Sequence, residues 1–343
     1  QGLGVGGFIG LDQPNLFGKC KRGTLQWQFG RYVNDFNLSY SDPSIRQTRF
    51  SGTVSAYRSQ ARYTVADLGR SLRTGGSFEV GFPIPNSPFS RLRLSYGAEV
   101  VSFGNSGLLG AQKSLYGNDS FRSTLGATLQ HDTRADMPFA TSGGMQQVSA
   151  QFSGGPLGGT YTFQQYRTEM RAYAPLGQIG GKAQGSQPMK FVLGLTGRAG
   201  VVTGNTGPFF YSQEFALGGV QYGEQLRGYP EFSISPFGYV TGTDNFNATR
   251  LSFGKAFFTA TGELGFRMNQ SLYVNLFTDV GNVYETARQF DPTRLFRGSG
   301  IGVSTVTPLG PLGLDYAYGF DRLDKFGRPD PKWVLHFRLG QLF

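Results

Sequence analysis

The sequence is poor in the residues that form most catalytic centres, metal sites and disulfides. It contains one cysteine, Cys20, and two histidines, His131 and His336. One cysteine cannot form an internal disulfide, and so few cysteines and histidines nearly exclude a zinc site with the usual ligands. No GxSxG elbow and no Ser/His/Asp set stands out in the chain. We therefore expect no catalytic residues, no metal and no cofactor, and we predict that the chain is not an enzyme.

Long apolar runs are also missing from the sequence. A transmembrane helix needs a run of about 18 or more apolar residues, and the chain has none. Charged residues make up only 16% of the chain, and the mean hydropathy is −0.27. A β-barrel in a membrane fits these values, because only every second strand residue faces lipid. The chain begins with Gln1 and not with methionine, which predicts a processed or truncated product.

The net charge of +10 indicates an anionic partner. Nucleic acid is one candidate, but the chain has no basic run and no aromatic-basic interleaving of a known module, so we expect no nucleic acid. The preferred interpretation places the cations in a polar lumen and against anionic lipid head groups. A formal GxGxxG match at Gly2, Gly4 and Gly7 lacks a preceding strand and a following helix, so it predicts no dinucleotide site.

Glycine, phenylalanine and tyrosine are abundant, with 52, 31 and 17 residues, and they stand in segments that alternate between two faces. In the last segment, Trp333, Leu335 and Phe337 fall on one face of a strand. His336 and Arg338 fall on the opposite face. An apolar, aromatic face opposed by a polar face is typical of a strand with lipid on one side and water on the other.

About fifteen such segments follow one another, with almost nothing that indicates a helix. A soluble β-sandwich also alternates, so the number of segments carries the argument for a barrel. The expected strands are 1–10, 22–32, 34–41, 47–58, 72–82, 91–103, 121–131, 144–154, 159–175, 188–202, 249–266, 271–284, 295–307, 311–320 and 333–343. Bacterial single-chain barrels have even strand numbers, so we predict an all-β transmembrane antiparallel barrel of about 16 strands. Its first strand would precede this chain or be replaced by a partner.

Connectors between the expected strands alternate between short and long, as in outer-membrane barrels. The longest, 203–248, is expected to have a function, because structureless loops beyond about 15 residues usually do. Inside it stand Leu217-Gly218-Gly219 and, further on, Arg227-Gly228-Tyr229. These two elements resemble the lumen-loop motif of the Omp85 superfamily. The resemblance implies that this loop plugs the lumen.

Further motifs extend the Omp85 resemblance over nearly the whole chain. The segment 277–281, FTDVG, resembles a strand motif of the family, and 307–315 resembles its penultimate hairpin. The segments 12–18 and 132–143 resemble two of its periplasmic turns, and the terminal Phe343 resembles its C-terminal recognition signal. The resemblance also implies that a first strand, and any POTRA domains, would lie upstream of Gln1.

The resemblance implies a membrane domain that catalyses the folding and insertion of β-barrel proteins in the bacterial outer membrane. Insertion would occur at a lateral seam between the first and last strands, where unpaired backbone groups can template an incoming strand. Trp333, Phe337, Gly340 and Phe343 would belong to the seam strand and its terminal signal. The implied partners are unfolded β-barrel clients, accessory subunits such as lipoproteins, and outer-membrane lipid and lipopolysaccharide.

Arg227, at the tip of a loop folded into a lumen, needs an anionic partner. Glu263 and Asp279 are expected on the inward faces of adjacent strands, so both carboxylates can converge on one guanidinium. Gly228 would give the turn its freedom, and Tyr229 would add a rigid amphipathic plug. The alternative is that Arg227 is a solvated loop charge.

Three other functions remain open from the sequence. A polypeptide-secreting transporter of the same superfamily would pass its clients through the lumen. A passive diffusion porin would have an open lumen and no clamp between Arg227 and the two acids. A barrel enzyme such as a lipase or protease would need a nucleophile constellation that the chain does not offer.

Overall fold

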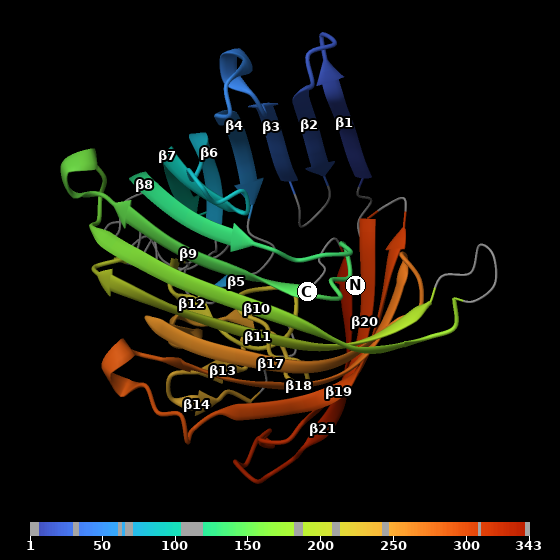
Figure 1. The fold of residues 1–343 in the computed structure, drawn as a ribbon. Coiled ribbons are helices and arrows are strands. Elements are labelled where there is room, and N and C mark those ends of the chain that lie inside the picture. The colour runs from blue at the N-terminus through green and yellow to red at the C-terminus, as the bar shows by residue number, and fades with distance from the viewer. Residues whose placement is uncertain are drawn as a thin grey trace.

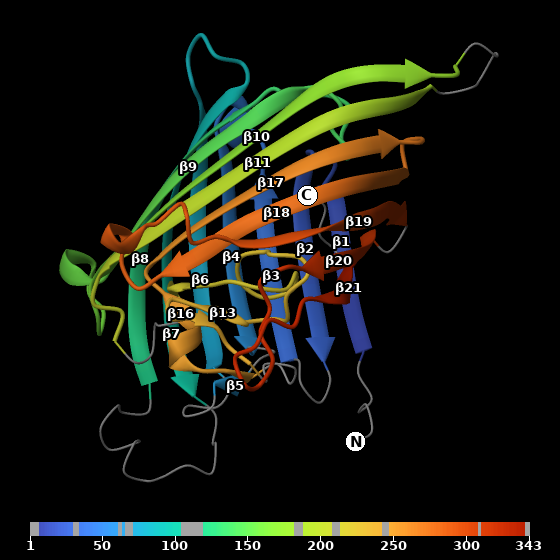
Figure 2. The ribbon, with the colours of Figure 1, turned by 90° about the horizontal axis from the view of Figure 1, so that it is seen from below.

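Fifteen strands form one antiparallel sheet in the described part of the chain, which confirms the predicted number. The computed structural model describes residues 7–29, 34–60, 64–65, 71–103, 119–181, 188–207, 213–241, 247–307 and 310–339. In sheet order the strands are β1 (Gly7–Leu16), β2 (Lys21–Phe29), β3 (Asn34–Asp42), β4 (Ser51–Gln60), β6 (Ser71–Pro83), β7 (Ser90–Phe103), β8 (Asp119–Asp132), β9 (Gly143–Ser153), β10 (Phe163–Ile179), β11 (Met189–Gly204), β17 (Ala256–Arg267), β18 (Leu272–Tyr284), β19 (Phe296–Thr307), β20 (Gly310–Gly319) and β21 (Lys332–Leu339). Figures 1 and 2 show the sheet curving around a central space.

The sheet is apolar outside and polar inside. On β21, the outward Trp333 and Leu335 are 51% and 67% exposed, whereas the inward His336 and Arg338 are buried. The neighbouring β20 repeats the pattern, with Leu314 exposed outside and Asp315 fully buried inside. A wall that exposes its large apolar side chains and buries its charges suits lipid outside and a polar lumen inside. The predicted assignment of faces on these strands is confirmed.

The connections lie on two rims because consecutive strands are antiparallel. We call one of them the turn rim; its connections are 17–20, 43–50, 84–89, 133–142, 180–188, 268–271 and 308–309. We call the other the loop rim; its connections are 30–33, 61–70, 104–118, 154–162, 205–255, 285–295 and 320–331. The longest connection therefore enters the lumen from the loop rim.

The long connection, which we call the lumen loop, fills part of the central space. It contains the short strand pairs β12 (Phe215–Ala216) with β16 (Phe253–Gly254) and β13 (Ile234–Ser235) with β14 (Gly238–Tyr239). Both ribbon views place β13 of this segment inside the curve of the sheet (Figures 1 and 2). The hydrophobic core of the molecule lies between the loop and the wall; it contains Val101, Phe163, Val202, Phe215, Leu217, Leu226, Tyr229, Ile234, Phe257 and Val283. None of the helices in the described residues is long and apolar enough to span a membrane.

Two strands continue past a proline, beyond the ends expected for them. The segment 12–18 was expected to be a turn, but β1 continues to Leu16 and the turn is 17–20. The strand expected over 159–175 continues to Ile179. In each case the pairing register shifts at the proline, between Gln13 and Leu16 and between Pro175 and Gly177. A bulge therefore accommodates a residue that lacks the N–H donor, and the strand goes on.

The lumen loop is also longer than the expected 203–248. Residues 203 and 204 belong to β11, and β17 begins only at Ala256. Between them, residues 250–252 form a short 3-10 helix and Phe253–Gly254 form β16. The strand expected over 249–266 is wrong at its start, because Phe253 is buried and β16 pairs with β12 inside the loop.

Candidate functional site

A carboxylate inside the lumen loop fixes the shape of the segment around the Leu-Gly-Gly element. Glu231 accepts hydrogen bonds from the backbone N–H groups of Val220 at 2.7 Å, Gln221 at 3.0 Å and Tyr222 at 3.0 Å. Gly219 makes this wrapping possible, with a φ of 71° and a position where a Cβ would lie 2.0 Å from Glu231 Oε1. Burial raises the pKa of the Glu231 carboxyl, although the three N–H donors oppose that shift. The predicted glycine therefore serves an internal anion-binding turn of the loop.

The two other residues of the Leu-Gly-Gly element, Leu217 and Gly218, stabilise the packing within the loop. Leu217 is fully buried in the core between loop and wall. Gly218 has a φ of 116°, and a Cβ there would lie 2.6 Å from the carbonyl oxygen of Pro230. The two segments of the loop on either side of the Glu231 turn therefore pack too closely for a larger residue at Gly218.

Arg227 lies in contact with both acids that the sequence proposed for it. Its Nε donates to Asp279 Oδ2 at 2.7 Å and its Nη2 to Asp279 Oδ1 at 2.7 Å, which is a bidentate pair. Nη2 also donates to Glu263 Oε1 at 3.2 Å, and the backbone N–H of Arg227 donates to Asp279 at 3.2 Å. The arginine is only 2% exposed, so it is not a solvated loop charge. The two acids stand on the paired strands β17 and β18, as expected.

Three contacts of Arg227 and Asp279 were not predicted. The Arg227 guanidinium carbon lies 3.3 Å from the centroid of the Phe277 ring, and its Nη1 lies 3.6 Å from Asp315 Oδ1. Thr261 donates to Asp279 Oδ1 at 2.8 Å. The signal for Phe277 and Asp315 was present in the sequence, because both stand in the family-like motifs and on inward faces of their strands.

Glycines in the barrel wall make room for the backbone at the loop tip. Gly228 has a φ of 90°, and a Cβ on it would lie 2.8 Å from the backbone nitrogen of Gly319. A Cβ on Gly298 would lie 2.1 Å from the carbonyl oxygen of Arg227. Gly298 and Gly319 are paired across β19 and β20, so together they form a shallow notch that receives Arg227 and Gly228. The sequence argument found Gly228 but missed this notch.

Tyr229 anchors the tip to the loop rim. Its hydroxyl donates to the carbonyl oxygen of Arg297 at 2.8 Å and accepts from the backbone N–H of Asp321 at 3.1 Å. Its ring is fully buried, with the Phe296 ring centroid at 6.0 Å in an edge-on arrangement. The predicted plug is therefore held by its polar end as well as by its ring.

The last strand contributes two buried side chains to the same site. His336 Nε2 accepts the backbone N–H of Gly228 at 2.9 Å. Arg338 donates to Asp315 from Nε at 2.5 Å and from Nη2 at 3.1 Å. Trp333 and Phe337 stand on the outer face, and Trp333 stacks on Tyr316 with ring centroids 4.6 Å apart. Gly340 and Phe343, which were predicted for the seam strand, lie outside the described residues.

The charges at this site form one network of two arginines and three acids. Arg227 and Arg338 face Glu263, Asp279 and Asp315, all of which are buried. A buried charge that loses its partner is strongly destabilising, so the network holds the loop tip against four strands of the wall, β17, β18, β20 and β21. Among the described residues, no group of three or more His, Cys, Asp or Glu side chains is arranged to hold a metal ion.

A second inward-facing segment reaches the same strands from the turn rim. This segment is the predicted turn 133–142. Its Asp136 forms salt bridges with Lys190 at 2.6 Å and with Arg267 at 3.3 Å. Its Phe139 is buried and stacks on Tyr273 of β18 with ring centroids 5.1 Å apart. Arg267 and Tyr273 are buried on the inner face of the wall, so the turn folds into the lumen and does not point away from it.

The fold and the site together define a transmembrane β-barrel with an anchored lumen loop. Residues 15–343 match the Omp85 superfamily domain, and the chain belongs to this family. It is 24% identical over 349 residues to the outer membrane protein assembly factor BamA of Nitratidesulfovibrio vulgaris, covering 99% of this chain and 40% of the relative. It is also 24% identical over 350 residues to the chloroplastic outer envelope protein 80 of Arabidopsis thaliana, covering 94% of this chain and 42% of the relative.

Two solved structures show the same fold. BamA from Haemophilus ducreyi lacking POTRA domains 1–3 matches with a TM-score of 0.69 and 18% identity, over 98% of this chain and 69% of that one. CdiB from Acinetobacter baumannii matches with a TM-score of 0.50 and 16% identity, over 97% and 55%. The chain spans less than half the length of the two relatives given above. It is a β-barrel of the outer membrane.

Proposed function

We propose that this chain is the membrane domain of a factor that folds β-barrel proteins and inserts them into the outer membrane. The seam between β1 and β21 would be the site of insertion. Family membership supports the proposal, as does the name of the assembly-factor relative. A 76-residue stretch is also 30% identical to the sorting and assembly machinery component 50 homolog of Xenopus tropicalis, over 22% of this chain and 16% of that protein.

The observation that carries the proposal is the pair of sheet edges. Among the described residues, β1 pairs only with β2, and β21 pairs only with β20. A strand edge presents unpaired N–H and C=O groups, which are costly in lipid and which can pair with an incoming extended strand. Trp333 and Leu335 already point outward on β21, so a strand added there would continue the apolar outer wall.

The anchored lumen loop favours insertion at the side over passage through the middle. The tip of the loop lies inside the lumen against the wall, where it is fixed by a buried bidentate pair between Arg227 and Asp279. Removing such a plug would require breaking buried ion pairs. A secretion transporter has to clear this path for each client, and a porin has to leave it open.

The proposed activity breaks and forms no covalent bond, so we propose that the chain is not an enzyme and uses no cofactor. The client's own folding would drive insertion. Its partners would be unfolded β-barrel clients, accessory subunits of the assembly machinery, and the lipid and lipopolysaccharide of the outer membrane.

The experiment uses the full-length protein in liposomes. An unfolded β-barrel client is added outside, and its folding is followed by the gel shift that separates folded from unfolded barrels. We expect the wild type to accelerate folding, Arg227→Ala to lose most of this acceleration, and Arg288→Ala to retain it. Arg288 is exposed in the loop-rim connection 285–295, so it is the matched arginine control. Appearance of unfolded client inside the liposomes, without folding in the bilayer, would instead identify a secretion transporter.

A further inference from the structure

The last strand has support from a strand neighbour on one side only. In the described residues β21 pairs with β20 and with no further strand. A strand of 8 residues with one neighbour is held weakly by its backbone alone, because an edge strand has half of its ladder hydrogen bonds. Its position therefore also depends on what contacts its inner face, and the lumen loop makes several of these contacts.

The first of these contacts joins the loop tip to a histidine. Gly228 donates its backbone N–H to His336 Nε2 at 2.9 Å, and His336 is 5% exposed. Gly228 cannot move toward the wall, because it already sits against the backbone of Gly319. The loop tip is thus a fixed point, and the imidazole of β21 is held to it by an acceptor nitrogen that must carry no proton.

The second contact passes through a shared carboxylate. Asp315 on β20 accepts two hydrogen bonds from Arg338 of β21 and lies 3.6 Å from Arg227 Nη1 on the loop. Asp315 is fully buried, so the interaction is little screened by water. Arg338 therefore takes its position from the same carboxylate that faces the loop arginine.

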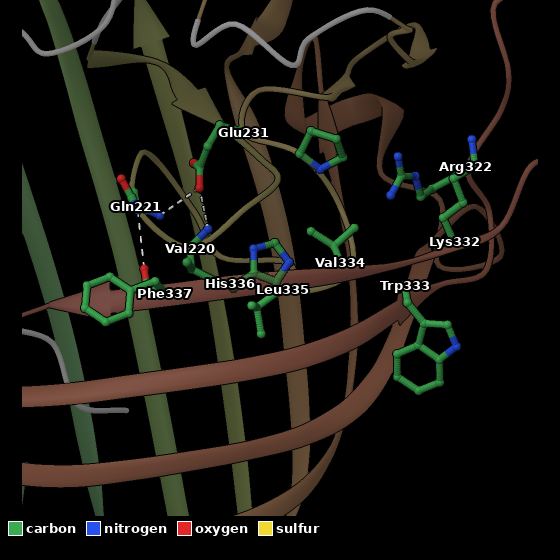
Figure 3. Close-up of a pocket in the computed structure, with 11 residues that line it drawn as sticks. Val220, Gln221, Glu231, Arg322, Lys332, Trp333, Val334, Leu335, His336 and Phe337 are labelled. Carbon is green, nitrogen blue, oxygen red and sulfur yellow. Dashed lines mark hydrogen bonds between the residues drawn. The ribbon is translucent and has the colours of Figure 1, made fainter. Parts of the chain in front are cut away.

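The third contact reaches the backbone of β21. Gln221 donates its side-chain amide to the carbonyl oxygen of Phe337 at 3.3 Å. Figure 3 shows Gln221 and His336 on the loop side of the strand and Trp333 pointing away from the loop. A cavity of about 370 Å³ is lined by Val220, Gln221 and Glu231 of the loop and by residues 332–337 of the strand. Close packing does not fill this gap, so polar contacts hold the strand here.

We infer that the lumen loop is a positioning element for β21, with His336, Asp315 and Gln221 as positioning residues. The loop contacts three consecutive residues of β21: the backbone N–H of Gly228 bonds to His336, the Gln221 amide bonds to the carbonyl of Phe337, and Arg227 reaches Arg338 through the Asp315 carboxylate of β20. This inference rests on the proposed function, because the contacts between the loop and β21 would hold the edge of β21 in the position where an incoming client strand pairs with it.

The test compares variants of His336 in the full-length protein in lipid nanodiscs. His336→Ala removes the acceptor for Gly228, and His336→Gln replaces it with an amide oxygen at a similar reach. We expect His336→Ala to speed hydrogen exchange of the β21 amides about fivefold, with His336→Gln close to the wild type. Client insertion should slow in His336→Ala and recover in His336→Gln. Gln221→Ala should shift exchange in the same direction by a smaller factor.

His131→Ala is the matched control. It is the other histidine of the chain, stands on β8 and bonds to Ser90 at 2.8 Å, away from the loop. This variant should leave β21 exchange unchanged.

Unchanged β21 exchange in His336→Ala would overturn the inference, and so would faster exchange spread equally over β8 and β21. Faster β21 exchange with normal client insertion would show that the contacts between the loop and β21 do not serve insertion. If the wild-type protein inserts no client, the proposed function itself is contradicted. That result does not depend on the hydrogen-exchange measurement.

Discussion

The first four strands and the last five strands of the sheet are built from the same alternation, yet their inner faces differ. In β1 to β4, none of the residues described in 9–29 and 34–60 is buried. The ion pair between Arg22 and Asp12 there leaves the two side chains 59% and 46% exposed. On the inner face of β17 to β21, the pair between Arg227 of the lumen loop and Asp279 leaves the two side chains 2% and 4% exposed. Alternation alone therefore builds a wall, and the lumen loop turns one side of that wall into a tightly packed, charged core.

The largest effect should come from the centre of the packed side. Arg227→Ala leaves Asp279 and Glu263 buried without their main partner, which costs about 3–5 kcal/mol. Arg227→Lys should restore little, because an ammonium cannot form the bidentate pair with Asp279. Urea unfolding of the folded barrel in detergent measures both values. If Arg227→Ala were as stable as the wild type, the buried ion pairs at β17 to β21 would contribute no more to stability than the exposed ones at β1 to β4.

The next effect should come from the turn 133–142. Phe139→Ala removes a buried ring that stacks on Tyr273, and losses of this kind cost about 3 kcal/mol or more when the site cannot collapse. The turn should then leave the lumen, and ion conductance through single barrels in planar bilayers should rise. Phe326→Ala is the control, because Phe326 is 72% exposed in the loop-rim connection 320–331. Equal conductance in Phe139→Ala and the wild type would show that the turn does not narrow the lumen.

A smaller effect should come from the notch in the wall. Gly298→Ala places a methyl group where the carbonyl oxygen of Arg227 lies, and overpacking of this kind costs about 1–3 kcal/mol. The loop tip should be displaced, and limited proteolysis should cut more rapidly within 213–241. Gly197→Ala on β11 provides the matched control, since a Cβ there meets nothing within 4 Å. If both variants resist protease equally, the notch does not hold the loop.

The smallest effect should come from the open side of the barrel. Arg22→Ala breaks an exposed pair with Asp12, and exposed pairs contribute little because water and salt screen them. The urea midpoint should stay at the wild-type value. A clear drop would mean that β1 and β2 depend on their inner-face charges, which would weaken the contrast with Arg227.

The sequence predicted the features that depend on local pattern. Trp333 outside and His336 inside follow from alternation, and the pairing of Arg227 with Asp279 follows from a charge that has to be neutralised on an inward face. Contacts that depend on which strands meet across the lumen could not be found in this way. Asp315 and the notch at Gly298 and Gly319 belong to this group, because they become partners of the loop only once the sheet has curved. Pro175 misled the prediction, since a proline can end a strand or sit in a bulge.

The hairpin of β17 and β18 carries both segments that enter the lumen. The lumen loop from one rim is tied to it at Glu263 and Asp279, and the turn 133–142 from the opposite rim is tied to it at Arg267 and Tyr273. The lumen loop and the turn 133–142 are therefore anchored to the same pair of strands. A push on the short connection 268–271, where this hairpin meets the turn rim, would tilt both anchor points together and so transmit a force from one face of the membrane toward the other.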